Sequence, residues 1–140
     1  MKLWCAVLLT ALLGLSGCGP RPKTPAELLP GTWMTKTGAV DVTITFVADG
    51  TTRWHIQDHS LAGWLVGMDV RFSGRWRVDG QRLHMETIDP PFVFLFSGFD
   101  KSFPGDQQIH ELDEDDLVIS EVADPDHSRI HFRRVAPAGR

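Results

Sequence analysis

Apolar and polar residues alternate along most of this chain, and no other feature restricts its fold as strongly. In residues 70–78 every even position is apolar or glycine and every odd position is polar or charged. This period of two is typical of a β-strand that buries one face and exposes the other. Further strands are predicted at 40–46, 52–56, 82–88, 108–112, 117–122 and 130–135. The sequence therefore predicts an all-β protein.

Tight turns separate neighbouring strands. Asp79 and Gly80 form one such turn, and Asp49 and Gly50 form another. Turns of this kind join antiparallel strands into hairpins. A meander of many short strands protects its edges best by closing on itself, so we expect an up-and-down antiparallel barrel of about eight strands.

Two segments depart from the alternation. Residues 92–96 are apolar at every position, which predicts a strand that is buried on both faces or lines an internal ligand space. The other segment has apolar residues at helical spacing, namely Leu61, Trp64, Leu65 and Met68. It predicts one short helix around residues 60–68, capped by Asp58 or Ser60 and docked on the barrel.

The beginning of the chain resembles the leader of a bacterial lipoprotein. Lys2 precedes an apolar stretch over residues 3–15, and small residues then lead to Cys18. The stretch is too short to span a bilayer comfortably, because a spanning helix needs about 20 residues. The resemblance implies that residues 1–17 are a signal peptide and that Cys18 receives acyl chains after cleavage. The alternative is an ordinary secretory signal with a chance cysteine.

The same resemblance implies a location in the cell. Gly19 rather than aspartate follows the cysteine, which by similarity to enterobacterial sorting rules favours the outer membrane, with the domain facing the periplasm. The membrane is then the expected partner, through the lipid on Cys18.

The whole chain has 14 lysines and arginines against 18 aspartates and glutamates, a net charge of −4. This balance argues against nucleic acid and anionic lipid headgroups as partners.

A short tether is predicted between the leader and the folded domain. Residues 18–25 contain three prolines, which favour an extended, solvated chain. Residues 24–27 have the form of a capping box with proline at the first helical position, and Pro30 limits this helix to about one turn. It opens a single domain, residues 26–136, which is large enough for one hydrophobic core. No disulfide is expected there, because both cysteines precede it.

Gly31 and Trp33 follow this turn and resemble the G-x-W motif of lipocalins and of short lipocalin-like lipoproteins of bacteria. In that family an arginine on the last strand covers the tryptophan and closes the base of the barrel. Arg133 and Arg134 are the two candidates here, and the resemblance spans most of residues 26–135 as a pattern of strands. The chain lacks tyrosine and the family's second T-D-Y-type motif, and it is shorter than typical lipocalins. A small or filled cavity is therefore expected.

A barrel of about eight strands is either filled by its own side chains or holds one small ligand. Large apolar residues that we expect inside it, as core or as ligand contacts, are Phe46, Trp54, Trp64, Phe72, Trp76, Met85, Phe94 and Phe96. The short helix would then form a lid over the mouth.

Polar clusters offer weaker hypotheses. His55 and His59 have the spacing of two metal ligands, but a structural zinc site needs three or four, so surface histidines are favoured and no metal is expected. The acidic run 111–116 lacks the glycine and spacing of an EF-hand loop and predicts a solubilising turn. The arginines of one strand face, Arg71, Arg75 and Arg77, are either a docking patch for an acidic partner or a solvated face.

No catalytic motif is present. Ser73 and Ser97 each precede a glycine, but neither lies in a G-x-S-x-G elbow, and the chain has no glycine-rich phosphate loop. We expect a non-enzymatic envelope lipoprotein without a cofactor, whose barrel binds a small apolar ligand. The alternative is a filled barrel that acts as a scaffold or protein-interaction module in the envelope. Fold analogy does not decide between them.

Overall fold

The computed structural model describes residues 19–66, 68–88, 105–123 and 129–135. These ranges contain two helices, α1 (Pro25–Leu28) and α2 (Leu61–Val66). They also contain the strands β1 (Gly31–Thr37), β2 (Val40–Phe46), β3 (Thr51–Asp58), β4 (Asp69–Asp79), β5 (Arg82–Thr87), β6 (Gly105–Leu112), β7 (Asp116–Glu121) and β8 (Ile130–Arg134). The apolar run 92–96, predicted as a strand, lies outside the described residues.

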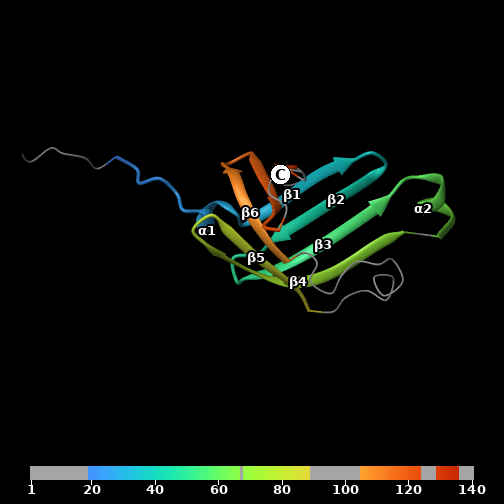
Figure 1. Cartoon of the computed structure of the whole chain (residues 1–140), viewed down its shortest axis with the longest axis horizontal. Helices are drawn as coiled ribbons and strands as arrows, with labels where there is room; N and C mark the ends of the chain where they lie inside the picture. Colours follow the sequence, from blue (N-terminus) through green and yellow to red (C-terminus); the bar gives the residue numbers. More distant parts are fainter. Residues whose placement is uncertain (1–18, 67, 89–104, 124–128, 136–140) are drawn as a thin grey trace, which may run out of the picture.

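The strands form a closed antiparallel barrel. Each strand pairs with the next in the chain, and β1 also pairs with β8, where Trp33 lies opposite Arg134. The prediction of an all-β, up-and-down barrel of about eight strands is therefore confirmed. Figure 1 shows α1 at one end of the barrel and α2 at the other, with residues 19–24 leading away from the α1 end.

Strand register explains why alternate residues share one environment. The register of β2, β3 and β4 places Ile44 beside Trp54 and Trp54 beside Phe72, and all three are buried. The intervening positions Arg53 and Ser73 are exposed. Because the side chains of a strand alternate between its faces, the apolar set of each strand lies inside the barrel.

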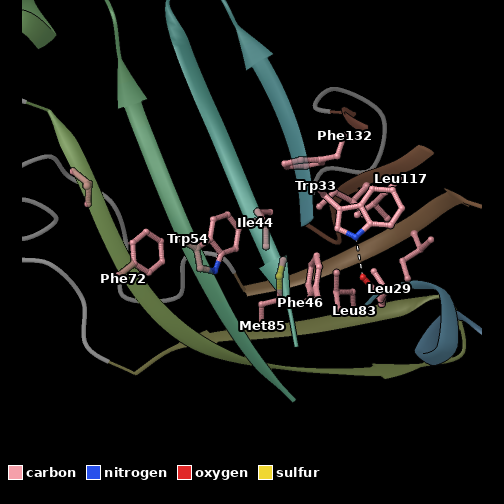
Figure 2. Packing of buried hydrophobic residues seen from close by; sticks show 13 residues of the cluster. Leu29, Trp33, Ile44, Phe46, Trp54, Phe72, Leu83, Met85, Leu117 and Phe132 are labelled. Carbon is pink, nitrogen blue, oxygen red and sulfur yellow. Dashed lines mark hydrogen bonds between the residues drawn. The ribbon is translucent and has the colours of Figure 1, made fainter. Parts of the chain in front are cut away.

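The most deeply buried side chains gather near the α1 end. Leu29, Trp33, Ile44, Leu83 and Leu117 have no exposed surface, and Figure 2 shows Trp33 packed beside Leu117 with Leu29 next to it. Burial of this kind contributes about 1.5–3 kcal/mol for each large apolar side chain. The packed core therefore stabilises the end of the barrel at which β1 begins.

Gly74 is the one inward-facing position of β4 that has no room for a side chain. A Cβ atom there would lie 2.3 Å from the Glu86 carbonyl oxygen and 2.8 Å from Thr52 Oγ1. The Glu86 oxygen belongs to the paired strand and cannot move aside easily. Glycine at this position is thus a requirement of close strand packing.

The first helix forms as expected at the entrance to the barrel. The Thr24 amide and hydroxyl donate hydrogen bonds to Glu27 Oε2 at 2.8 and 2.9 Å. The backbone hydrogen bond from Thr24 is the main reason why the pKa of Glu27 is lowered. The carboxylate therefore stays ionised at the start of the helix, where negative charge is favourable.

The second helix is shorter than predicted and ends at Val66. Of its predicted apolar stripe, Leu61 and Leu65 do not dock on the barrel, whereas the side chain of Trp64 lies outside those described. Leu61 and Leu65 are 75% and 70% exposed. Of the two predicted caps, Ser60 caps the helix, because its Oγ accepts a hydrogen bond from the Gly63 amide at 3.0 Å. Gly63 is buried because it lies against Asp58 so closely that a Cβ atom would come within 2.5 Å of it. Within the described ranges, no helix has the length and apolarity needed to cross a membrane.

Candidate functional site

The base of the barrel is closed around Trp33. Its indole nitrogen donates a hydrogen bond of 2.8 Å to the Leu29 carbonyl, which ties β1 to the end of α1 (Figure 2). The Arg134 guanidinium carbon lies 4.2 Å from the centre of the Trp33 ring. This distance is well within the range of a cation–π contact, worth about 1–2 kcal/mol where solvent is excluded.

Arg134 also joins three backbone segments. It donates from Nη1 to the Pro30 carbonyl at 2.9 Å, from Nη2 to the Leu28 carbonyl at 2.6 Å, and from Nε to the Glu114 carbonyl. The planar fork of a guanidinium suits this arrangement, because its donors are held in fixed directions. One side chain thus links α1, the β6–β7 turn and β8.

Gly31 makes this contact sterically feasible. Its φ angle is +140°, a conformation that other residues rarely adopt. A Cβ atom on Gly31 would also lie 2.2 Å from Arg134 Nη1. The glycine of the G-x-W motif therefore leaves the space that the guanidinium occupies.

Of the two arginines left open by the sequence, the structure places Arg134 over the tryptophan. Arg133 points outward, with a side chain that is 87% exposed, and its Nε lies 3.6 Å from Asp116. The difference follows from strand alternation, because Arg134 and the buried Phe132 are two residues apart on the same strand.

Aromatic pairs occupy part of the barrel interior above this base. Phe46 and Trp76 pack edge to face with ring centres 5.6 Å apart, and Trp54 and Phe72 stack with centres 5.4 Å apart and planes inclined by 6°. Met85, opposite Trp76 on β5, is also buried. These five residues from the predicted interior set all belong to the core cluster or pack against it.

The rest of that predicted set is not described. Phe94 and Phe96 lie outside the described residues, as does the predicted lipidation residue Cys18. Trp64 belongs to α2, but its side chain is not among those described.

One further apolar row lies between the Trp54–Phe72 stack and α2. Strand register aligns Val42, Ile56 and Val70 in this row. Val42 and Ile56 are half-buried although they pack against the core, whereas Ile44 one row below is fully buried. Burial thus decreases towards the α2 end on β2 and β3, whereas Val70 of β4, in the same row, stays buried.

The two histidines considered as metal ligands make separate contacts. His55 Nε2 lies 2.8 Å from Asp69, and His59 Nε2 lies 3.3 Å from Asp41. Asp58 instead accepts a hydrogen bond from the Ser60 amide, which is the main reason why its pKa is lowered. In the part of the chain that the structure describes, no three histidine, cysteine or acidic side chains gather as a metal site would require.

The acidic run forms the turn between β6 and β7. Asp113 accepts hydrogen bonds from the amides of Asp115 and Asp116, and these bonds lower its pKa. Glu114 pairs with Lys23 of the predicted tether at 2.6 Å, and the hydrogen bond from Lys23 lowers the pKa of Glu114. The turn therefore fastens the chain before α1 to the base of the barrel.

The predicted basic row lies on the outer wall. Arg71, Arg75 and Arg77 are all exposed on β4, and Arg71 Nε lies 3.4 Å from Asp69. Arg53 of β3 joins them, since the register places it opposite Ser73. Sequence reasoning missed Arg53, because only the pairing of β3 with β4 brings it next to this row.

No protein-family model and no curated protein matches the sequence. The solved structure of a lipocalin-like protein from Bacteroides uniformis matches with a TM-score of 0.52 at 14% identity, over 76% of this chain and 98% of the other. An uncharacterized protein from Bacteroides eggerthii matches with the same TM-score at 11% identity, over 76% and 99% of the two chains.

The fold is a lipocalin-like barrel. At these identities the similarity concerns the fold alone, and it extends over nearly the whole of each matched structure. In the lipocalin-like barrel seen here, Trp33, Arg134 and Gly31 close the base. Fold does not determine function, so the function must be argued from the interior and the surface.

Proposed function

We propose that the protein is a lipid-anchored, lipocalin-like barrel of the cell envelope that binds a small apolar ligand without changing it chemically. The observation that supports ligand binding is the incomplete burial of two inward-facing apolar residues near the α2 end, Val42 of β2 and Ile56 of β3. Half-buried apolar side chains on a concave wall gain free energy when an apolar molecule displaces water from them.

The expected site begins where the packed aromatics end. The stacked rings of Trp54 and Phe72 form its floor, and Val42, Ile56 and Val70 form one wall. Side chains with no charge and no strong hydrogen-bonding group surround this space on β2, β3 and β4. The ligand class is therefore small, neutral and apolar.

A neutral phenylnaphthylamine dye should bind to the purified full chain with saturable fluorescence. We expect Ile56→Trp to weaken binding about tenfold, because the larger side chain fills the space beside the Trp54–Phe72 floor. Titration followed by dye emission measures the change. Gln57→Trp is the matched control, since its side chain lies on the outer face of the same strand, and it should leave the affinity unchanged.

This proposal fails if the dye, fatty acids, sterols and quinones all give no saturable binding. It also fails if Ile56→Trp and Gln57→Trp weaken binding equally, because the ligand would then lie outside the barrel.

Anchoring is tested separately. The lipobox-like residues before Cys18 support acylation of its sulfur and, after cleavage, of its amino group. Cells supplied with labelled palmitate should label the wild-type chain and Cys5→Ser, but Cys18→Ser should carry no label. Unlabelled wild-type protein, or label retained in Cys18→Ser, would contradict the anchor.

A filled barrel that serves as an interaction module is the second candidate. It is favoured by the packing of Phe46 against Trp76 and of Trp54 against Phe72, which occupies much of the interior with the protein's own rings. The dye titration distinguishes the two, because a filled barrel gives no saturable signal.

A further inference from the structure

The outer wall of the barrel carries a groove of about 430 Å³ across β2, β3 and β4. The outward-facing residues that line it form two adjacent cross-strand rows, Thr43–His55–Arg71 and Thr45–Arg53–Ser73. No aspartate or glutamate lines this groove in the described ranges of the chain. The groove is therefore a positively charged feature on a protein whose net charge is negative.

Every outward-facing side chain in these rows can donate a hydrogen bond. Arg53 and Arg71 contribute guanidinium groups, and Thr43, Thr45 and Ser73 contribute hydroxyl groups. The Thr45 hydroxyl lies 3.0 Å from Thr32 Oγ1 and can donate to a ligand when Thr32 is the donor of that pair. Residues opposite each other on paired strands have Cβ atoms about 4.5–5.5 Å apart, so donors on neighbouring strands can reach one ligand. Such a set suits an oxyanion with several acceptor oxygens.

Both arginines have guanidinium N–H groups for which the described residues provide no acceptor. In the described part of the chain, Arg53 makes no ion pair and donates no hydrogen bond, although its charge contributes to lowering the pKa of Asp49. Arg71 uses Nε towards Asp69 at 3.4 Å, and no described residue accepts from its terminal nitrogens. Guanidinium groups with free terminal nitrogens bind anions through paired, charge-assisted hydrogen bonds.

Asp69 orients one side of the groove. It lies 2.8 Å from His55 Nε2 and 3.4 Å from Arg71 Nε, so it holds both groups beside the groove. Burial alone would raise the pKa of Asp69, but the hydrogen bond from His55 and the charges of His55 and Arg71 outweigh it and the pKa is lowered. With His55 neutral, the charges of Arg53 and Arg71 still exceed that of Asp69.

We propose that this outer groove binds a phosphate monoester, with Arg53 and Arg71 as its charge partners and the three hydroxyl groups as additional donors. A carboxylate has two oxygens on one plane, whereas a phosphate presents three terminal acceptor oxygens, which matches donors arriving from three strands. The site lies outside the barrel and is independent of the proposed interior ligand.

The test uses the purified full chain in neutral detergent and amide proton–nitrogen NMR spectra. The probes are glycerol phosphate and a water-soluble short-chain phosphatidic acid, which carry the same phosphate monoester without and with acyl chains. We expect saturable shifts at the amides of the two rows. Arg53→Gln should weaken binding about tenfold, because it removes an unpaired guanidinium. Arg77→Gln, an exposed arginine of the same wall outside the groove, is the matched control and should bind as the wild type does.

The two probes distinguish a soluble phosphate ester from a lipid headgroup, since tighter binding of one assigns the source. The proposal is overturned if neither probe gives saturable shifts at millimolar concentration. It is also overturned if Arg53→Gln and Arg77→Gln weaken binding equally, because that result indicates general electrostatic attraction. Neither result bears on dye binding inside the barrel.

Discussion

Replacing Trp33 with alanine should lower the free energy of unfolding by about 3–5 kcal/mol, the range found for large aromatic side chains truncated in a core. Trp33 has no exposed surface and packs among Leu29, Ile44 and Leu117. The truncation also removes the hydrogen bond to the Leu29 carbonyl and the ring beneath Arg134. Urea denaturation followed by circular dichroism measures the change.

Trp33→Phe is the informative companion variant. It keeps an aromatic ring under the guanidinium but lacks the indole N–H, so the Leu29 carbonyl loses its partner. We expect a loss of about 1–3 kcal/mol, from the unsatisfied carbonyl and the smaller ring. A loss below about 1 kcal/mol in Trp33→Ala would contradict the view that this residue closes the base.

The fold could be predicted because one simple pattern recurs throughout the chain. Burial of alternate residues in Val70, Phe72 and Gly74 follows directly from the sequence, since a strand has only two faces. The turns at Gly50 and Gly80 have positive φ angles, as tight hairpins require. The alternation of apolar and polar residues, together with the turn residues, was sufficient to predict an antiparallel meander that closes into a barrel.

The base of the barrel was predictable only in part. Gly31 and Trp33 stand out in the sequence, but both Arg133 and Arg134 were candidates for the covering arginine. The alternation of β8 carries the missing signal, because Phe132 is buried and Arg134 shares its face. The carbonyl groups of Leu28 and Pro30 carry no sequence signal, since every residue has a carbonyl.

Two features depend on tertiary context that a sequence does not contain. The helical stripe of Leu61, Trp64, Leu65 and Met68 predicted a docked helix, yet Leu61 and Leu65 are exposed. Gly63 is buried instead, because only glycine allows the helix to approach Asp58 so closely. The outer groove depends on Arg53, which lies 18 residues before Arg71 in the chain and becomes its neighbour only through strand register. Cross-strand neighbours of this kind follow once the pairing is known.

Replacing Arg134 with methionine should lower the free energy of unfolding by about 3 kcal/mol, because three carbonyl groups lose a charged donor and the Trp33 ring loses its cation. Methionine keeps much of the aliphatic stem, so the loss reports on the guanidinium. Arg134→Lys restores the charge but not the planar fork, and it should recover only a small part of the stability.

Arg133→Met is the matched control for this experiment. It removes the same charge from the adjacent position of β8, but its side chain is 87% exposed and its contact with Asp116 is 3.6 Å long. An exposed pair of this kind contributes little, so urea denaturation should show no measurable change. Equal destabilisation by Arg133→Met and Arg134→Met would contradict a specific closure. A much larger effect of Arg134→Met would mean that one guanidinium holds α1, the β6–β7 turn and β8 together, and that the α1 end is the sealed end of the barrel.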